Sequence, residues 1–434
     1  MITNSVSDNY SHYLSFLRQL VNLPSVFTKP ESVKTALLFC KGIFEKNLDE
    51  YSVFFDKENN LIALPKNINL QENITYLSAH IDTVDANISD WDTPFHPWKL
   101  YEDEKEIVAR GVSDCKAGVA YQLFLSFLLK NDLLKLENVG FMITFKEEGS
   151  GKKTSVEMAK NMGKELPVSQ KSNYLFVLEN TVQVADKSTL CIYTSERGNY
   201  VIKITDDILK LQQYVKKLTN WNPVCILPKG KTDTIDWLIK RQNGGHACSV
   251  KRSDNLLTQV ILEAQANSLI QAGEVQNFAT IPTNIRVSSA NNSKKHILIL
   301  SNRSFDSLSE IHNQLKDIEY EQVKDFAISE GLNIEEKFLK NNISSIINNY
   351  EDDNLNLEYT YNIGASDASI IYNSLDKSYR KNFYPIVLGP GTRSQRKLNP
   401  QRLTHGKNET FDKETGKQVI IFISELLKKL NHIQ

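Results

Sequence analysis

Histidine and carboxylate side chains follow several apolar runs in the first half of the chain. His80 and Asp82 follow "ITYLSA", and Glu179 follows "YLFVL". Two adjacent glutamates, Glu147 and Glu148, end "FMITFKEE". Imidazole and carboxylate groups are ligands that zinc accepts, and a carboxylate near a metal-activated water is the usual general base of hydrolysis. These residue types therefore indicate metal-assisted hydrolysis.

Further candidates lie outside these runs. Asp114 stands in "ARGVSDCKAG", and His405 and Glu409 stand in "RLTHGKNET". Taken singly, each residue has a simpler interpretation, because a histidine at a strand end is more often just hydrogen-bonded and an isolated acid usually faces solvent. A metal site is favoured because such residues follow one apolar run after another.

The spacing of these residues predicts different roles for them. In a strand, residues two apart point to the same side, so the Asp82 carboxylate can reach the second ring nitrogen of His80 and orient that ring as a ligand. Glu147 and Glu148 are neighbours, so in extended backbone their side chains point apart. One of the two glutamates can then bind a metal while the other faces the reacting water.

The elements that must position these residues alternate between strands and helices. We expect strands over 73–84, 137–148 and 172–180, an amphipathic helix over 13–23, and a helix with 3.6-residue apolar periodicity over 116–134. This alternation predicts an α/β fold whose mainly parallel, mixed sheet is flanked by helices. Such sheets bind ligands beyond the carboxyl ends of their strands, which is where the candidate residues stand.

The pattern changes after residue 198. Strands expected over 200–204, 280–289 and 294–304, the last two joined as a hairpin, combine with two helices into a small α+β domain of the split βαβ, ferredoxin-like kind. An extra helix and a loop rich in Pro, Gly and Lys enlarge this domain. The expected organisation is a first catalytic part over 1–197, an inserted domain over 198–340 enlarged by 206–238, and a second catalytic part over 341–434.

The composition excludes several classes of partner. The 434 residues include 51 basic and 52 acidic ones, a formal charge of −1, so no bulk field attracts nucleic acid or an anionic membrane. No stretch approaches the ~20 apolar residues of a membrane helix, and the first residues lack the pattern of a secretion signal. The five cysteines form no CxxC pair, which argues against a disulfide framework and favours a cytoplasmic location.

Taken together, the motifs resemble a known family. The segments "HIDTV", "ARGVSDCKAG", "EEGSG" and "GPG" followed by "HGKNE" are similar, in order and combination, to those of a zinc-dependent peptidase and amidohydrolase family. This family includes aminoacylase, acetylornithine deacetylase, succinyl-diaminopimelate desuccinylase, glutamate carboxypeptidase and peptidase T. The segments "LVNLPSV" and "GASDAS" resemble further parts of it, and the motifs span residues 20 to 411.

The resemblance implies a site with two zinc ions. Ligands of this kind also accept cobalt or manganese, so the native metal stays open. By resemblance, Asp114 bridges the two ions, Asp82 supports His80, and Glu147 is the general base and acid. The five metal ligands implied are His80, Asp114, Glu148, Glu179 and His405.

The resemblance also implies residues that contact the substrate. The segment "QNGGHACS" makes His246 the residue that stabilises the oxyanion, and in dimeric relatives this histidine acts in the other subunit. We therefore expect a homodimer in which the inserted domain serves as lid and dimerisation domain. Arg303 would contact a substrate carboxylate, although Ser301 replaces the aspartate common in the family. Gly389 and Gly391 would shape the substrate pocket.

Two segments depart from the spacing common in the family. Residues 206–238 enlarge the inserted domain, and residues 392–404 form a longer and more basic connection between "GPG" and His405. The basic residues of this connection suit either a solvated loop or an anion-binding rim: Arg393, Arg396, Lys397 and Arg402.

The expected function is a deacylase that hydrolyses the amide bond of an N-acyl amino acid or a similar amine. The nearest alternative is a dipeptidase or carboxypeptidase that acts on short peptides by the same chemistry. The sequence is also compatible with a non-catalytic metal-binding homologue and with an enzyme whose basic loop recruits an acidic carrier protein. A panel of acylated and peptide substrates distinguishes the deacylase from the peptidase, and metal analysis tests the non-catalytic homologue. Charge reversal of the basic loop, assayed on a carrier-linked substrate, tests the carrier protein.

Overall fold

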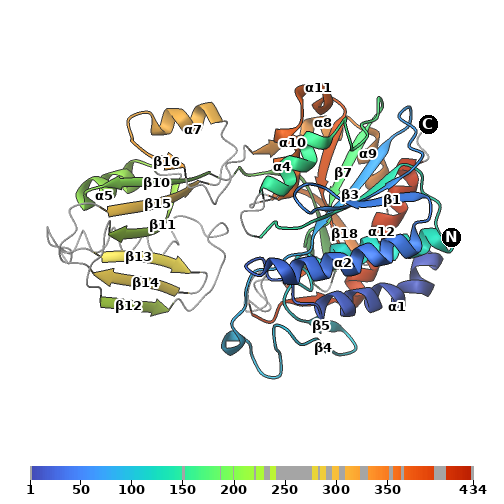
Figure 1. Ribbon diagram of the computed structural model, residues 1–434, viewed down its shortest axis with the longest axis horizontal. Helices are drawn as coiled ribbons and strands as arrows, with labels where there is room; N and C mark the ends of the chain where they lie inside the picture. Colours follow the sequence, from blue (N-terminus) through green and yellow to red (C-terminus); the bar gives the residue numbers. More distant parts are fainter. Residues whose placement is uncertain are drawn as a thin grey trace. The chain divides into compact units, whose positions relative to one another are not determined.

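The computed structural model describes most of the chain as two compact units (Figure 1). Unit 1 comprises residues 1–195, 332–362 and 366–434, and unit 2 comprises residues 196–331 and 363–365. The described residues are 2–148, 152–185, 187–198, 200–218, 221–228, 235–240, 276–281, 284–289, 296–302, 308–322, 331–350, 355–362, 366–394 and 407–431.

Unit 1 is built on a mixed sheet with a parallel centre. Its central strands run in the order β6 (Val139–Thr144), β3 (Ile74–His80), β7 (Asn173–Val177) and β19 (Phe383–Val387), and all three pairings are parallel. Antiparallel pairings extend both sides. The predicted α/β sheet is therefore confirmed. The outer strands are β1 (Tyr51–Phe55), β2 (Leu61–Pro65), β8 (Val182–Val184), β9 (Ser188–Glu196) and β20 (Thr392–Ser394).

Helices cover both faces of this sheet because its central strands are apolar on both sides. In β3, Leu77 and Ala79 belong to one hydrophobic core and Tyr76 to the other. The first core is shared with α1 (Ile2–Val21), α2 (Pro30–Asn47), α3 (Lys116–Lys130) and α12 (Lys413–Asn431). The second is shared with α4 (Lys152–Asn161) and α10 (Asp367–Ser374). Among the helices of the described residues, none has the length and apolar character needed to cross a membrane.

Smaller elements complete unit 1. A three-stranded sheet has the order β21 (Thr410–Asp412), β5 (Glu106–Val108) and β4 (Tyr101–Glu102), which brings the last part of the chain beside the segment before α3. Strands β17 (Leu332–Asn333) and β18 (Leu355–Asn362) both pair with β9. The remaining short helices are η1 (Ile88–Asp90), α8 (Glu335–Leu339), α9 (Asn342–Asn348) and α11 (Lys377–Arg380).

The boundary after the inserted part differs from the one expected at residue 340. Residues 332–340 belong to unit 1, because β17 pairs with β9 and the Phe338 side chain is buried in the first core. The short strand and the single helical turn of α8 leave little periodicity for a sequence pattern to detect.

Unit 2 contains an antiparallel sheet of seven strands within the described residues. The strand order is β12-β14-β13-β11-β15-β10-β16, and Leu298 and Leu300 of β15 share a core with Leu211 and Val215 of α5 and with Ile311 of α7. The strands are β10 (Tyr200–Asp206), β11 (Trp221–Pro228), β12 (Ile235–Lys240), β13 (Gln276–Ile281), β14 (Asn284–Ser289), β15 (His296–Asn302) and β16 (Glu321–Gln322). The helices described are α5 (Ile208–Lys217) and α7 (Leu308–Leu315).

One pairing predicted for this unit is wrong. The pattern predicts a single strand over 280–289 that forms a hairpin with the strand after it. Instead β14 pairs with β13 and β12, whereas β15 lies between β10 and β11. Leu298 and Leu300 of β15 are buried between two neighbouring strands, and this burial outweighs the preference for a neighbour in sequence. The segment 206–238 adds the expected helix and also two strands, β11 and β12.

Candidate metal centre

Three parallel strands bring the first candidate residues to one edge of the sheet. His80 is the last residue of β3 and lies level with Thr144, the last residue of β6. Ser78 of β3 is level with Val177 of β7, two residues before Glu179. Because parallel strands end at the same edge, the segments that carry His80, Glu147 and Glu179 start side by side.

The His80 ring is buried and held in one orientation. Its Nδ1 donates to the backbone oxygen of Asp82 at 2.9 Å, while the nearest carboxylate oxygen of Asp82 lies 3.5 Å away. The backbone carbonyl is therefore a closer partner than the predicted carboxylate. Donation from Nδ1 leaves Nε2 as the ligand atom, and Nε2 lies 3.0 Å from Asp114 Oδ1 and 3.9 Å from Glu179 Oε1.

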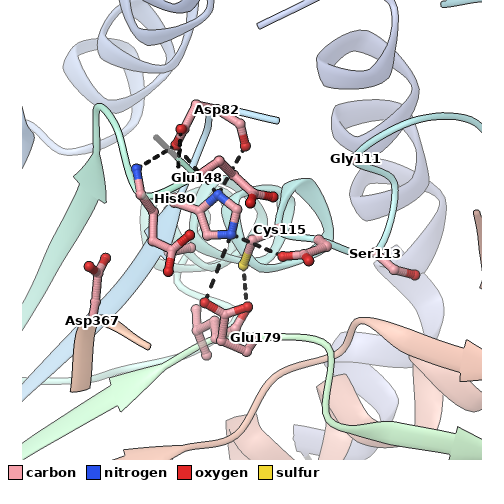
Figure 2. Close-up of polar contacts among 12 residues, drawn as sticks. His80, Asp82, Gly111, Ser113, Cys115, Glu148, Glu179 and Asp367 are labelled. Carbon is pink, nitrogen blue, oxygen red and sulfur yellow. Dashed lines mark hydrogen bonds and ion pairs between the residues drawn. The ribbon is translucent and has the colours of Figure 1, made fainter. Parts of the chain in front are cut away.

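Four of the five predicted ligands lie together here: His80 itself, Asp114, Glu148 and Glu179. Figure 2 labels His80, Glu148 and Glu179 in this arrangement. One ligand atom each from His80, Asp114 and Glu148 lie within 4.8 Å of one another, and a second group of the same kind consists of His80, Cys115 and Glu179. The fifth predicted ligand, His405, lies outside the described residues. Of the adjacent glutamates, Glu148 is the one that joins the first group.

Asp82 has a second set of contacts that the sequence does not reveal. Its Oδ1 accepts the backbone N–H of Glu147 and its Oδ2 accepts that of Glu148, both at 2.9 Å. Asp82 is fully buried, and hydrogen bonds to a buried carboxylate are strong. One side chain therefore holds the segment with both glutamates against the strand that carries His80.

Burial and neighbouring charges change the pKa values in this centre. Burial, together with the charges of Asp114, Asp367 and Glu148, raises the pKa of Glu179 to about 8, although His80 acts in the opposite sense. Burial is also the main reason that the pKa of Glu147 is well above its usual value. For His80, burial would lower the pKa, but hydrogen bonds to Asp114 and Asp82 and the charge of Glu179 raise it well above its usual value.

Cys115 is a member of the second group that the sequence interpretation did not consider. Its thiol donates to the backbone oxygen of Leu178 at 2.7 Å. Burial and the neighbouring charge of Glu179 raise the pKa of the thiol well above its usual value. The hydrogen bond to this backbone oxygen makes Cys115 a packing neighbour of Leu178, the residue directly before Glu179. Its place directly after Asp114 is the signal that could have drawn attention to it.

Asp367 is a further buried acid whose charge acts on Glu147 and Glu179. Its carboxylate accepts the hydroxyl of Thr144 at 3.1 Å and that of Ser155. Thr144 ends β6 and Ser155 lies in α4, so Asp367 connects the two sides of the segment that carries Glu147 and Glu148. The segment "GASDAS" resembles the family, but the sequence assigns no contact to its aspartate.

Gly389 and Gly391, predicted to shape the substrate pocket, pack against the backbone at or next to the proposed metal ligands Glu179 and Asp114. A Cβ on Gly389 would lie 2.3 Å from the backbone oxygen of Glu179, and one on Gly391 would lie 2.3 Å from that of Ser113. Close packing therefore explains why both positions are glycine. Contact of Gly389 and Gly391 with a substrate stays a prediction. Two further predicted residues, His246 and Arg303, lie outside the described residues, and their roles stay predictions as well.

The residues present suit a divalent cation. The group offers an imidazole nitrogen and carboxylate oxygens, which zinc, cobalt and manganese all accept. Burial is the main cause of the raised pKa values of Glu147 and Glu179, and the charges of the neighbouring acids add to it. A positive charge among these acids would favour their ionised forms. Donor chemistry and electrostatics within the described residues thus agree with a bound metal.

Comparison with family models assigns most of the chain. The model of the family described as Peptidase family M20/M25/M40 matches residues 76–429, a range that holds every candidate ligand. No curated protein sequence matches the chain.

Solved structures with the same fold cover nearly the whole chain at low sequence identity. A tripeptidase from Staphylococcus aureus subsp. aureus mu50 is 16% identical with a TM-score of 0.55, covering 97% of this chain and 98% of its own. Human carnosine dipeptidase 1 is 10% identical with a TM-score of 0.61, covering 100% and 99%. A Bacillus subtilis protein described as a dinuclear metal binding peptidase is 13% identical with a TM-score of 0.51, covering 97% and 98%. At these identities the likeness shows the fold alone.

Proposed function

The chain belongs to Peptidase family M20/M25/M40, and from this premise we propose that it hydrolyses the amide bonds of short peptides at the centre around His80. Membership makes the chain a metal-dependent hydrolase of amide or peptide bonds. The observation that carries the proposal is the convergence of the buried His80 and Asp114 with the half-buried Glu148 and Glu179, with Glu147 next to one of these residues.

We propose that two divalent ions bind here, held by His80, Asp114, Glu148, Glu179 and His405. The Bacillus subtilis structure with the same fold is described as dinuclear, which supports this number. Bound metal ions would polarise the amide carbonyl and lower the pKa of water. Asp114 lies within 3.0 Å of His80 Nε2 and belongs to the ligand group with Glu148, which suits the bridging position.

Glu147 is the proposed general base and acid. It accepts the proton of the attacking water and delivers that proton to the nitrogen of the leaving amine. Burial, and then the charges of nearby acids, raise the pKa of Glu147, which makes its carboxylate a stronger proton acceptor than that of an exposed glutamate. Its backbone position is held by Asp82. His246 is the proposed support for the oxyanion.

Short peptides are the proposed substrates because similar folds include a tripeptidase and a dipeptidase. The deacylase expected from the sequence would use the same residues and differ only in the group on the acyl side of the bond. Homodimerisation, and the role of unit 2 as a lid, stay parts of the proposal.

A substrate panel tests this function. Dipeptides, tripeptides, N-acetyl and N-succinyl amino acids are offered to the purified full chain with zinc, cobalt or manganese supplied in parallel. We expect hydrolysis of the peptides, and hydrolysis of the N-acyl amino acids alone would make the protein a deacylase. Bound metal without hydrolysis of any substrate would favour the non-catalytic homologue. A chain that binds none of the metals would contradict the proposed centre.

A further inference from the structure

Glu409 is a buried acid outside the proposed ligand set, and both of its oxygens are fully engaged. Oε2 accepts Arg110 Nη1 at 2.8 Å and the backbone N–H of Gly111 at 3.0 Å. Oε1 accepts the backbone N–H groups of Ser113 and Asp114, each at 3.0 Å. Its side chain is 2% exposed. One carboxylate therefore organises the whole turn from 110 to 114, including the amide of the proposed bridging ligand.

The fold brings Glu409 to this turn through backbone pairing. Strand β21 pairs with β5, and the N–H of Ala109 continues the ladder by donating to the backbone oxygen of Glu409 at 3.1 Å. The Ser113 hydroxyl also donates to the backbone oxygen of Thr410 at 2.8 Å. The segment just after His405 and the turn with Asp114 are thus a single hydrogen-bonded unit.

We propose that Glu409 is a positioning residue that holds Asp114 in its metal-binding geometry before an ion arrives. This inference rests on the proposed function, because it takes Asp114 as a ligand. A ligand on an ordered backbone loses less conformational entropy on binding, and hydrogen bonds to an ionised carboxylate are strong enough to order a turn. The Arg110 guanidinium offsets the charge of Glu409 at 2.8 Å, so Glu409 orders the turn without adding a free negative charge to the ligand cluster.

Because both oxygens of the Glu409 carboxylate accept hydrogen bonds, glutamine is an informative replacement. Each oxygen accepts two donors, so an amide at this position would direct its own N–H groups at donors whichever way it is turned. Glu409→Gln keeps the shape of the side chain and disturbs the turn. An exposed glutamate five residues later, Glu414 in the first turn of α12, provides the matched control Glu414→Gln.

The test is zinc affinity measured by competition with a chelator, on the full chain and far below its unfolding temperature. We expect Glu409→Gln to bind zinc about 10–100-fold more weakly than wild type and to show an altered visible spectrum with cobalt, while Glu414→Gln matches wild type. A folded Glu409→Gln protein with wild-type zinc affinity and cobalt spectrum overturns the inference. A wild-type chain that binds no zinc contradicts the proposed function instead.

A second variant separates positioning from general damage. Arg110→Gln removes the guanidinium but leaves the three backbone donors of Glu409, so we expect lower stability with zinc affinity close to wild type. An equal loss of zinc affinity in Arg110→Gln and Glu409→Gln would overturn the inference, because it would show that any disturbance of this buried pair weakens the site.

Hydrogen exchange on the wild-type protein provides a measurement that needs no variant to fold. The amides of residues 111, 113 and 114 are expected to be protected equally with zinc and with chelator, because Glu409 accepts them in both states. Fast exchange of these amides in the metal-free protein would contradict preorganisation by Glu409.

Discussion

The adjacent residues Glu147 and Glu148 have different surroundings in this centre. Glu148 shares a group of ligand atoms with His80 and Asp114, whereas burial and the neighbouring acids raise the pKa of Glu147. Asp82 accepts the backbone N–H of each glutamate, from 65 and 66 positions away in the chain, and so holds the backbone of both. Single substitutions can therefore separate metal binding from proton transfer.

Replacement of Glu147 tests the proposed proton transfer. Glu147→Gln keeps the size of the side chain but cannot accept the proton of water, so we expect kcat to fall by about 10²–10⁴-fold with two metal ions still bound. Steady-state kinetics together with metal analysis measure this. The control is Glu137→Gln, at an exposed glutamate before β6. Full activity in Glu147→Gln would exclude it as the base.

Replacement of Asp82 tests its double role. In Asp82→Asn, the amide group must direct N–H atoms at the N–H of either Glu147 or Glu148, so one of the two hydrogen bonds is lost. We expect metal affinity and kcat each to fall by about 10–100-fold. Chelator competition and kinetics on the same preparation measure both. If only stability changed, Asp82 would be a purely structural residue.

At the scale of elements, the centre depends on close packing between α3 and the segment after β7. Gly118 of α3 faces this segment, where a Cβ would lie 2.3 Å from the backbone oxygen of Leu178. Leu178 directly precedes Glu179 and accepts the Cys115 thiol. The approach of the helix thus positions two segments that carry proposed ligands, Asp114 before α3 and Glu179 after β7.

Two helical glycines provide a matched test of this packing. Gly42 lies in α2 with no atom within 4 Å of an added Cβ, so Gly42→Ala should raise the free energy of unfolding by about 0.5–1 kcal/mol. Gly118→Ala gains the same helix propensity but must displace Leu178, and we expect a net loss of about 1–3 kcal/mol. Urea denaturation measures both changes. Equal stabilisation of the two variants would show that α3 can shift without cost.

At the scale of the whole molecule, the two ends of unit 1 are joined through one ion cluster. Glu102 of β4 accepts Arg18 of α1 in a bidentate pair at 2.7 Å and Lys413 of α12 at 2.9 Å. Hydrogen bonding to Arg18 is the main reason that the pKa of Glu102 is lowered to about 2. The cluster therefore connects the first and last helices described.

The depressed pKa of Glu102 predicts how stability depends on pH. A carboxyl whose pKa falls on folding stabilises the folded state above its unfolded pKa, and this contribution is lost as the pH falls toward the folded value. We expect wild type to be more stable than Glu102→Gln at pH 6, with the difference decreasing from about pH 4.5 toward pH 2. Urea denaturation of both proteins across this range measures it. A stability difference between the two proteins that stays constant with pH would contradict the low pKa of Glu102.

Part of the fold follows from local patterns alone. The alternation of apolar strands with helices predicts the parallel centre of the unit 1 sheet, because β3, β6 and β7 are apolar on both faces and bounded by polar segments. The pattern fails for β14 and β15, because the chain offers several strands of similar length and the two pair with other strands rather than with each other. It also fails for residues 332–340, whose elements are short.

The sequence by itself determined which residue types end the strands, and therefore that His80, Glu148 and Glu179 would meet at one edge. Parallel strands make this a consequence of chain direction. Only the tertiary structure decided which partners hold them. The backbone oxygen of Asp82, rather than its carboxylate, is the closest partner of His80 Nδ1, and Glu409 accepts amides almost 300 residues earlier in the chain. Contacts between side chains and distant backbone depend on packing and leave no periodic signal in the sequence.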